Sequence, residues 1–342
     1  RTGNAFPVST IHSFLNSLIK DYKKNIHTVI GELFYIPEFV TSEKTDEISD
    51  KDYKKNEYER YKNLYEKYAD RYYQMTRQSV DKVKGKREYD KNPMMFNTAL
   101  NGDIAYINEM IRKEIASKDY SLVGYNDTSF ESLKDLTFGH DGLLKIFHLL
   151  ISKYPLLSKM IADRYDYIFI DEYQDTNADI VCDLLNVSQN SELTLCLFGD
   201  SMQSIYSDGI GNVDEYIDSY LVSIPKPDNY RCAFEIIDFV NQLRLDGLKQ
   251  EVALKIDVKG EVESTESRHG FAKVLYSVCE KKPNIRSSDE EKEAYQSKID
   301  ALISRAKEYC PTSKILMLTN KAIAKKIIFN ICIKFLTTDI TM

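Results

Sequence analysis

The sequence predicts an α/β fold with a parallel sheet, because two short apolar runs flank a segment of helical periodicity. Residues 167–171 and 193–198 are apolar runs of strand length, and residues 179–187 carry apolar side chains at helical spacing. Strand, helix, strand in this order predicts a right-handed βαβ unit. Because the first run is almost wholly apolar, we expect its strand to be buried on both faces. Asp171 and Gln203 then follow neighbouring strands, so we expect them at neighbouring strand ends.

Two adjacent carboxylates, Asp171 and Glu172, follow the first of these strands. In a parallel α/β sheet, ligands gather beyond the carboxyl ends of the strands. One carboxylate there can hold a hydrated magnesium ion, and the other can accept a proton from an attacking water. This layout is typical of a nucleotide-hydrolysis site.

Composition limits the classes of partner and compartment. The chain has 46 basic and 53 acidic residues and a net charge of −7, so no global field attracts nucleic acid or an anionic membrane. Any nucleic-acid site must then be a local groove. The six cysteines form no C-x-x-C pair, which favours free thiols in a reducing compartment. No apolar run approaches the roughly 20 residues of a membrane span, and we expect a soluble cytoplasmic protein.

The first 137 residues contain two features with competing interpretations. Residues 8–14 predict a strand edge that is followed directly by a helix, with Thr10 and His12 at the junction. In the alternative interpretation, Thr10 caps the helix and His12 is a surface residue. Residues 51–82 predict a long charged helix whose tyrosines recur every three or four positions. The stripe could stack on unpaired bases, but a helix-packing seam is favoured. It consists of Tyr58, Tyr61, Tyr65, Tyr68 and Tyr72.

Further along, residues 143–161 predict a helical stretch broken near Pro155. A third apolar segment at residues 220–224 precedes Tyr230 and Arg231, and a helix follows. An arginine just past a strand end can reach a phosphate bound at that edge; the alternative is a surface arginine paired with Glu235. The last part of the chain predicts a helix, a strand and a helix that begin a second α/β unit, at residues 290–309, 314–319 and 322–335.

Four motifs follow one another along the chain: V-S-T-I-H-S-F from Val8, Y-D-Y-I-F-I-D-E-Y-Q-D-T from Tyr165, F-G-D-S-M-Q-S-I-Y from Phe198 and N-Y-R-C from Asn229. In this order they resemble superfamily 1 DNA helicases of the UvrD/Rep/PcrA type. The resemblance implies a RecA-like P-loop NTPase motor domain with a parallel sheet, a mainly helical 1B-type insertion, and the start of a second RecA-like domain. The corresponding ranges are 1–36 and 135–245 for the first motor domain, 37–134 for the insertion, and 246–342 for the second.

The resemblance also implies a role for each matched residue. Asp171 would coordinate Mg²⁺, and Glu172 would position and deprotonate the attacking water. Gln203 would sense the γ-phosphate of ATP, Arg231 would neutralise its charge in the transition state, and Tyr230 would stack on the adenine. Contacts with single-stranded DNA would come from Thr10 and His12 at the backbone and Tyr206 near the bases. Movement along DNA would run 3′ to 5′, as is usual for the family.

Three departures from the family pattern shape the functional expectation. No G-x-x-x-x-G-K-[ST] phosphate loop occurs in these 342 residues, and the family's later motifs are missing. The chain begins at Arg1 and ends at Met342 after an apolar run, so we expect a segment of a longer protein. After Tyr206, the segment S-D-G-I-G replaces the usual Arg-Gly-Ala, and an aromatic residue that the family stacks on a base is absent.

Two functions therefore remain open at this point. The first is an ATP-dependent helicase or translocase on single-stranded or partly duplex DNA. The second is a helicase-like regulatory subunit that assembles with a partner nuclease, since short UvrD-like proteins occur in bacterial antiphage systems such as Gabija, paired with an OLD-family nuclease. Neither function involves a membrane.

Overall fold

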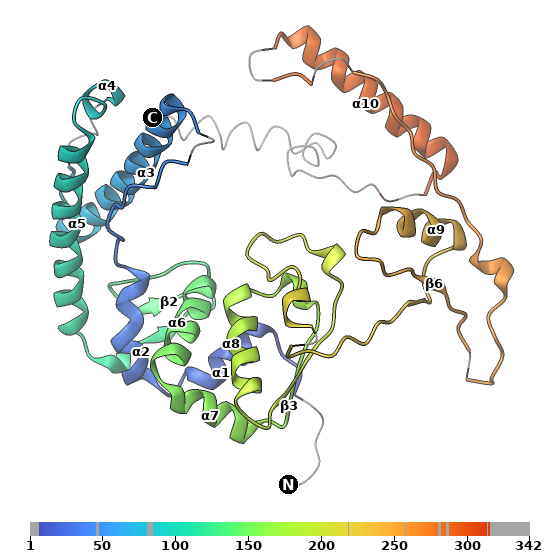
Figure 1. Ribbon diagram of the computed structural model, residues 1–342, viewed down its shortest axis with the longest axis horizontal. Coiled ribbons are helices and arrows are strands. Elements are labelled where there is room, and N and C mark those ends of the chain that lie inside the picture. The colour runs from blue at the N-terminus through green and yellow to red at the C-terminus, as the bar shows by residue number, and fades with distance from the viewer. Residues whose placement is uncertain are drawn as a thin grey trace. The chain divides into compact units, whose positions relative to one another are not determined.

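The computed structural model describes residues 7–314, apart from 46–47, 81–84, 218, 257, 280–281, 285–286 and 313. The chain divides into two compact units, Arg1–Ile224 and Pro225–Met342 (Figure 1). The predicted strand at 314–319 and helix at 322–335 lie outside the described residues, apart from Lys314. Among the described residues, no helix is both long enough and apolar enough to cross a lipid bilayer.

The first unit is mainly helical, with two small parallel sheets. The helices and 3-10 turns of its first half are α1 (Ile11–Ile19), α2 (Lys23–Val29), η1 (Ile30–Leu33), α3 (Asp50–Thr76), α4 (Lys86–Tyr89), α5 (Pro93–Ala116) and η2 (Tyr120–Leu122). Its second half contains β1 (Gly124–Tyr125), β2 (Thr137–Phe138), α6 (His140–Lys153), α7 (Pro155–Arg164), β3 (Tyr167–Ile170), η3 (Tyr173–Asp175), α8 (Ala178–Gln189), β4 (Thr194–Leu197), η4 (Ser201–Gln203) and η5 (Asp214–Tyr216).

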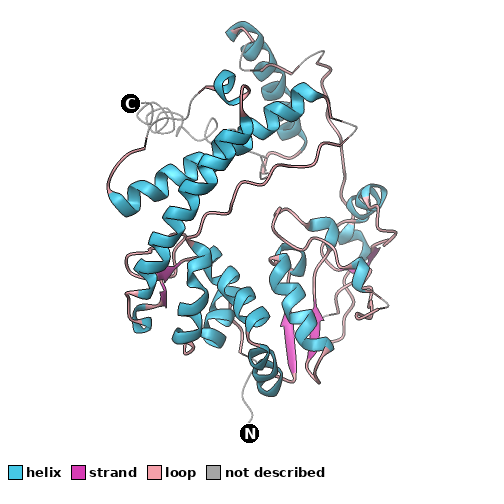
Figure 2. Cartoon of the chain, turned by 60° about the vertical axis from the view of Figure 1, so that its left-hand side comes forward, coloured by secondary structure: helices cyan, strands magenta, loops and turns pink. Residues whose placement is uncertain are grey.

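Strands β3 and β4 pair in parallel through the crossover helix α8, as the sequence predicts. The register runs from Tyr167 opposite Thr194 to Ile170 opposite Leu197, and the strands lie side by side in Figure 2. Helix α8 packs on β4 and also on α6 and α7. The break predicted near Pro155 is confirmed, because this proline begins α7.

Burial of β3 differs from the prediction. Ile168 and Ile170 are buried against the helices, but Tyr167 is 57% exposed and Phe169 51%. The two exposed rings stack on one another with centroids 6.2 Å apart. Burial on both faces was therefore wrong for these residues: the helices cover only the face with the isoleucines, and the aromatic face borders a cavity.

The start of the chain also differs from the prediction. Residues 7–10 form no strand, and Val8 is exposed. Thr10 has extended backbone geometry, and its hydroxyl accepts a hydrogen bond from the Ser13 backbone N–H at 3.2 Å. Thr10 is therefore the N-cap of α1, which satisfies one of the free N–H groups at the helix start.

The tyrosine stripe of α3 is a packing seam. Tyr61 is 4% exposed, and its ring lies 4.8 Å from that of Tyr89 and 6.0 Å from that of Phe96, measured between centroids. Tyr68 is equally buried, and burial raises the pKa of both phenols to about 12. Because these rings are enclosed between α3, α4 and α5, Tyr61 and Tyr68 are not available to stack on bases.

The second unit contains β5 (Asp228–Asn229), α9 (Phe234–Leu243), β6 (Glu251–Val252), η6 (Thr265–Arg268) and α10 (Asp289–Tyr309). Strands β5 and β6 pair in parallel. Helix α10 confirms the helix predicted at 290–309 and begins with a capping box at Ser288 and Glu291. The apolar segment at residues 220–224 is not a strand; the strand before Arg231 is β5.

Candidate nucleotide and DNA site

A cavity of about 1240 Å³ in the first unit brings together four of the predicted site residues. Thr10 and His12 line it from the start of α1, and Asp171 and Glu172 line it from the end of β3. The aromatic side chains of β3, Tyr167 and Phe169, also line it, as does Phe198. A pair of carboxylates at a strand end and the N-terminus of a helix therefore face one space.

Glu172 has unusual backbone geometry. Its φ of 49° and ψ of 47° place it in the left-handed region, which costs a non-glycine residue about 1 kcal/mol or more. Its N–H donates to Oδ1 of Asp171 at 3.1 Å. Such strain persists only where surrounding contacts over-determine the conformation.

Gln174 provides those contacts and was missed by the sequence reasoning. Its side chain is 1% exposed; Nε2 donates to Oε2 of Glu172 at 2.7 Å, and Oε1 accepts from the N–H of Asp200 at 3.1 Å. One buried amide thus connects the Glu172 carboxylate to the loop after β4. The sequence feature that could have indicated this contact is the glycine at position 199. Any other residue there would place a Cβ 2.1 Å from Gln174 Oε1.

Backbone hydrogen bonds join the loop after β3 to the loop after β4 at several points. Tyr173 N donates to Phe198 O at 3.0 Å, Gly211 N to Gln174 O at 3.1 Å, and Ile210 N to Thr176 O at 2.9 Å. The Asp175 carboxylate accepts from Ile205 N at 3.3 Å. A shift in either loop is therefore transmitted to the other.

Gln203 and Tyr206 lie on the loop after β4 and do not line the cavity. Gln203 is exposed, and its Nε2 donates to Oδ2 of Asp200 at 2.9 Å. The ring of Tyr206 is also exposed. Both side chains face solvent beside the Asp171 and Glu172 loop, to which their own loop is bonded.

The carboxylates fit a magnesium ion held jointly with a nucleotide. Mg²⁺ prefers oxygen ligands and usually takes one or two carboxylates, with water and phosphate oxygens completing the shell. Asp171 is exposed at the strand end, and among the described residues its carboxylate accepts one hydrogen bond, from Glu172 N. In the described part of the chain, no group of three or more His, Cys, Asp or Glu could enclose a metal ion. The donor set is thus that of a shared site rather than a protein cage.

His12 belongs to a polar cluster that sequence reasoning did not detect. Its ring lies 4.8 Å from that of His140, edge to face. The Tyr125 hydroxyl donates to Asp127 Oδ1 at 2.9 Å and lies 2.7 Å from His140 Nδ1. With the hydroxyl proton directed to Asp127, Nδ1–H of His140 donates to the phenol oxygen. Burial, and then the nearby His140, lower the pKa of His12, so a neutral imidazole faces the cavity at pH 7.

Tyr230 and Arg231 belong to the second unit and follow β5. Arg231 does not pair with Glu235, so that alternative was wrong. The Glu235 carboxylate instead contacts His269 Nδ1 at 2.9 Å and accepts from Gly270 N at 2.8 Å, and these contacts lower the pKa of Glu235 to about 2. Within the described residues, the Arg231 guanidinium is exposed and has no hydrogen bond or ion pair. Tyr230 is half exposed beside it.

Comparison with known proteins identifies related sequences. The profile of the family described as UvrD/REP helicase N-terminal domain matches residues 3–218. Gabija protein GajB of Bacillus cereus is 28% identical over 277 residues, which cover 74% of this chain and 40% of GajB. A DNA helicase II homologue of Mycoplasma genitalium is 31% identical over 126 residues, covering 34% of this chain and 18% of that protein. The RecBCD enzyme subunit RecB of Buchnera aphidicola is 31% identical over 130 residues, covering 38% of this chain and 9% of RecB. The chain thus spans less than half the length of each relative.

Proposed function

Because this chain belongs to the UvrD/REP helicase N-terminal domain family, we propose that it is part of an ATP-dependent DNA helicase or translocase. The proposed motor couples ATP hydrolysis to 3′ to 5′ movement on single-stranded DNA. The observation that carries the proposal is the pairing of Asp171 and Glu172 at the end of β3, with Glu172 held by the buried Gln174 amide. The family implies a RecA-like α/β fold, and the parallel β3–α8–β4 unit is consistent with it.

The residues at the strand ends divide the proposed chemistry between them. When bound, ATP supplies the phosphoryl bond to be cleaved, and Mg²⁺ neutralises charge on its phosphates. Asp171 would hold the ion, and Glu172 would orient a water and accept its proton. Gln203 would contact the γ-phosphate, Tyr230 would stack on the adenine, and Arg231 would counter the charge that develops in the transition state.

The free guanidinium supports the role given to Arg231. An arginine engaged in a structural ion pair would have to break that pair before it could bind a phosphate. Arg231 has no such partner among the described residues, while the neighbouring Glu235 is fully engaged elsewhere. A planar guanidinium is well suited to binding phosphate through two N–H groups at once.

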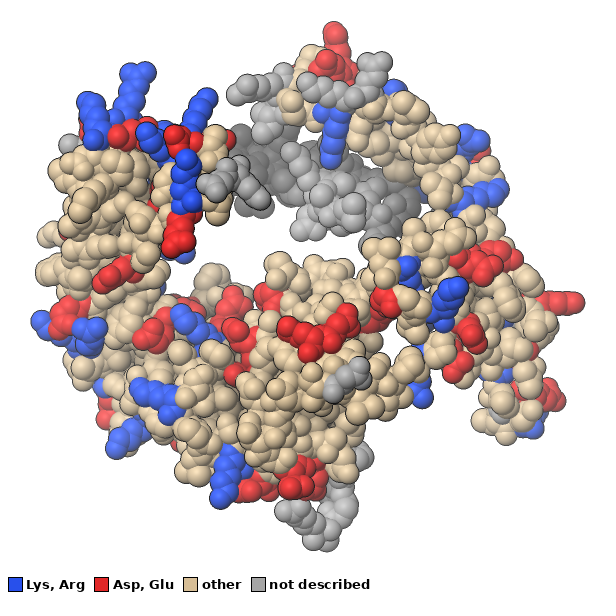
Figure 3. All heavy atoms as spheres, viewed as in Figure 1, with Lys and Arg blue, Asp and Glu red and all other residues tan. Residues whose placement is uncertain are grey.

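DNA contacts are proposed at the start of α1 and near Tyr206. Thr10, Ile11 and His12 at the start of α1 line the cavity, and a helix N-terminus favours phosphate. Figure 3 shows basic side chains gathered around α4 with acidic ones among them, and both signs over the rest of the visible face of this unit. Because the chain has a net charge of −7, DNA would be bound through local contacts rather than through a global positive field.

The domain assignment is part of the same proposal. Residues 37–134, which contain α3, α4 and α5, would form the 1B-type insertion between the two parts of the first motor domain, 1–36 and 135–245. Residues 246–342 would begin the second motor domain. A cytoplasmic location, where DNA and ATP are both present, also belongs to this proposal.

A second function is favoured by the similarity to GajB, which extends over 74% of this chain. In this alternative the protein is a regulatory subunit of an antiphage complex and assembles with a partner nuclease. Purification of the full-length protein from its native host tests this: a nuclease present in stoichiometric amount supports assembly, and a protein purified alone contradicts it.

Directional translocation tests the first proposal. Full-length protein is incubated with ATP and single-stranded DNA that carries biotin and streptavidin at either end. We expect faster streptavidin displacement from the 5′ end, the destination of 3′ to 5′ movement. The proposal would be contradicted if streptavidin were displaced from neither end. It would also be contradicted if displacement were equal at both ends and occurred without ATP.

A further inference from the structure

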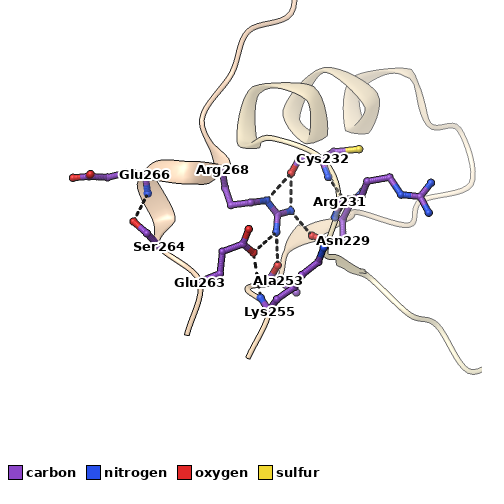
Figure 4. A network of polar contacts seen from close by, with 9 residues as sticks. All are labelled: Asn229, Arg231, Cys232, Ala253, Lys255, Glu263, Ser264, Glu266 and Arg268. Carbon is purple, nitrogen blue, oxygen red and sulfur yellow. Dashed lines mark hydrogen bonds and ion pairs between the residues drawn. The ribbon is translucent and has the colours of Figure 1, made fainter. Parts of the chain in front are cut away.

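The loop that carries Tyr230 and Arg231 is held by a buried arginine from a distant part of the sequence. Arg268, in η6, has a side chain that is 5% exposed. Its five N–H donors make five hydrogen bonds, so the guanidinium is fully satisfied (Figure 4). The acceptors are Asn229 O at 2.8 Å, Cys232 O at 2.7 and 3.2 Å, Ala253 O at 2.8 Å and Glu263 Oε2 at 3.3 Å.

Two of these acceptors bracket the residues proposed to bind ATP. The carbonyl groups of Asn229 and Cys232 lie immediately before and after Tyr230 and Arg231, and the same Nη2 of Arg268 binds both. From inside the loop, Oδ1 of Asn229 accepts from Arg231 N at 2.9 Å and from Cys232 N at 2.8 Å. The backbone of residues 229–232 is therefore fixed from both sides.

The Arg231 side chain itself takes no part in this network. Figure 4 shows it extending away from Arg268 and Glu263, and no described residue pairs with its guanidinium. Backbone restraint combined with a free head group is the arrangement expected of a preorganised ligand-binding arginine.

The same segment also fixes the helix that follows. Directly after Arg268, His269 and Gly270 bind the carboxylate of Glu235 in the first turn of α9. The His269 ring stacks on Phe234 with centroids 5.0 Å apart. Residues 268–270 thus restrain both the loop and the start of α9.

We propose that Arg268 is a positioning residue: it binds the carbonyl groups on either side of Tyr230 and Arg231 and so fixes the backbone from which the Arg231 guanidinium would bind the nucleotide. This rests on the proposed role of Arg231. Glutamine at position 268 cannot supply five donors, and lysine places a single ammonium group where a planar fork is required. The Arg231 backbone would then sample several conformations, and misplacement by about 1 Å can reduce a rate about 100-fold.

The test is a double-mutant cycle on the full-length protein, with kcat and KM for ATP measured in DNA-stimulated hydrolysis. We expect Arg268→Gln to lower kcat about 10- to 100-fold with a smaller change in KM. Because Arg268 acts through Arg231, Arg231→Ala combined with Arg268→Gln should be no slower than Arg231→Ala alone. The cycle is repeated with Arg268→Lys, which keeps a buried cation, so that a folding defect in the glutamine variant does not decide the result.

Arg244 provides a matched control. Its side chain is also 5% exposed and pairs with Asp246 in the same unit. Arg244→Gln should lower Tm without the loss of kcat. Multiplicative effects of the Arg231 and Arg268 changes, or equal kcat in the Arg268→Gln and Arg244→Gln variants, would overturn the inference while leaving the role of Arg231 intact. Unchanged kcat in Arg231→Ala would overturn both.

Discussion

The side-chain amide of Gln174 donates to the Glu172 carboxylate over 2.7 Å and accepts from the Asp200 N–H over 3.1 Å. This buried amide bridges the loops at the ends of β3 and β4. It satisfies one oxygen of a carboxylate that sits on strained backbone and is otherwise exposed. The position of the proposed catalytic base thus depends on a side chain that does not reach solvent.

Replacing Gln174 by Glu tests this dependence. The donor to Glu172 is lost and two carboxylates are brought together, so we expect a loss of about 1–3 kcal/mol in the free energy of unfolding and a reduced kcat. The loss should diminish as the pH is lowered, because one of the two carboxylates takes up a proton. Urea unfolding between pH 5 and pH 8 measures this loss of unfolding free energy. Gln189→Glu, at the exposed end of α8, is the control, and an equal effect in both variants would refute the bridge.

Gly199→Ala tests the packing around the same amide. The added Cβ would lie 2.1 Å from Gln174 Oε1 and 2.9 Å from Tyr173 Cδ1, and overpacking of this kind costs about 1–3 kcal/mol. At Gly102, in the exposed interior of α5, an added Cβ meets nothing within 4 Å, and alanine there should stabilise by about 0.5–1 kcal/mol. Opposite shifts in the urea midpoint are expected; shifts of the same sign would be inconsistent with the structure.

The cluster around His12 predicts a pH dependence of folding. Burial and His140 lower the pKa of His12 from 6.5, while Asp141 and Asp127 oppose the shift. Below pH 6.5 the unfolded chain binds a proton that native His12 does not yet bind, so stability falls as pH decreases through the window between the two pKa values. His12→Gln should flatten this part of the curve of unfolding free energy against pH, and His140→Gln should flatten it partly. A slope unchanged in His12→Gln would rule out this origin.

Alanine substitutions on α3 test whether its tyrosine stripe is a packing seam. Tyr61→Ala removes a ring enclosed by those of Tyr89 and Phe96 and should destabilise by about 3–5 kcal/mol. Tyr73, half exposed on the same helix, should tolerate alanine with little effect. Urea unfolding measures the loss of unfolding free energy in each variant. Equal losses of stability in the Tyr61→Ala and Tyr73→Ala variants would contradict the seam.

Local patterns in the sequence were sufficient to predict the βαβ unit and the carboxylates at its strand end. Apolar runs and helical spacing are properties of neighbouring residues, and β3, α8, β4 and the break at Pro155 follow from them. Exposure of the β3 aromatic face could not be predicted in this way, because it depends on which elements pack on the sheet.

The contacts that refine the candidate site join residues far apart in the chain. His140 meets His12, and His269 takes the carboxylate of Glu235 that would otherwise be open to Arg231. No periodicity or motif spacing contains such pairings. Gln174 lies within a motif, but its burial arises from the loop after β4, which approaches closely only because residue 199 is glycine.

ATP hydrolysis by the full-length protein, measured with and without single-stranded DNA, tests the central claim most directly. We expect magnesium-dependent hydrolysis that DNA stimulates, and a loss of about 10²-fold or more in kcat in Glu172→Gln, which keeps the shape of the side chain but cannot accept the proton from water. ATP binding should persist in this variant, because Glu172 is assigned to the water and not to the nucleotide. Absence of DNA-stimulated hydrolysis in the wild type, or an unchanged rate in Glu172→Gln, would contradict the assignment of this chain to an ATP-driven DNA motor.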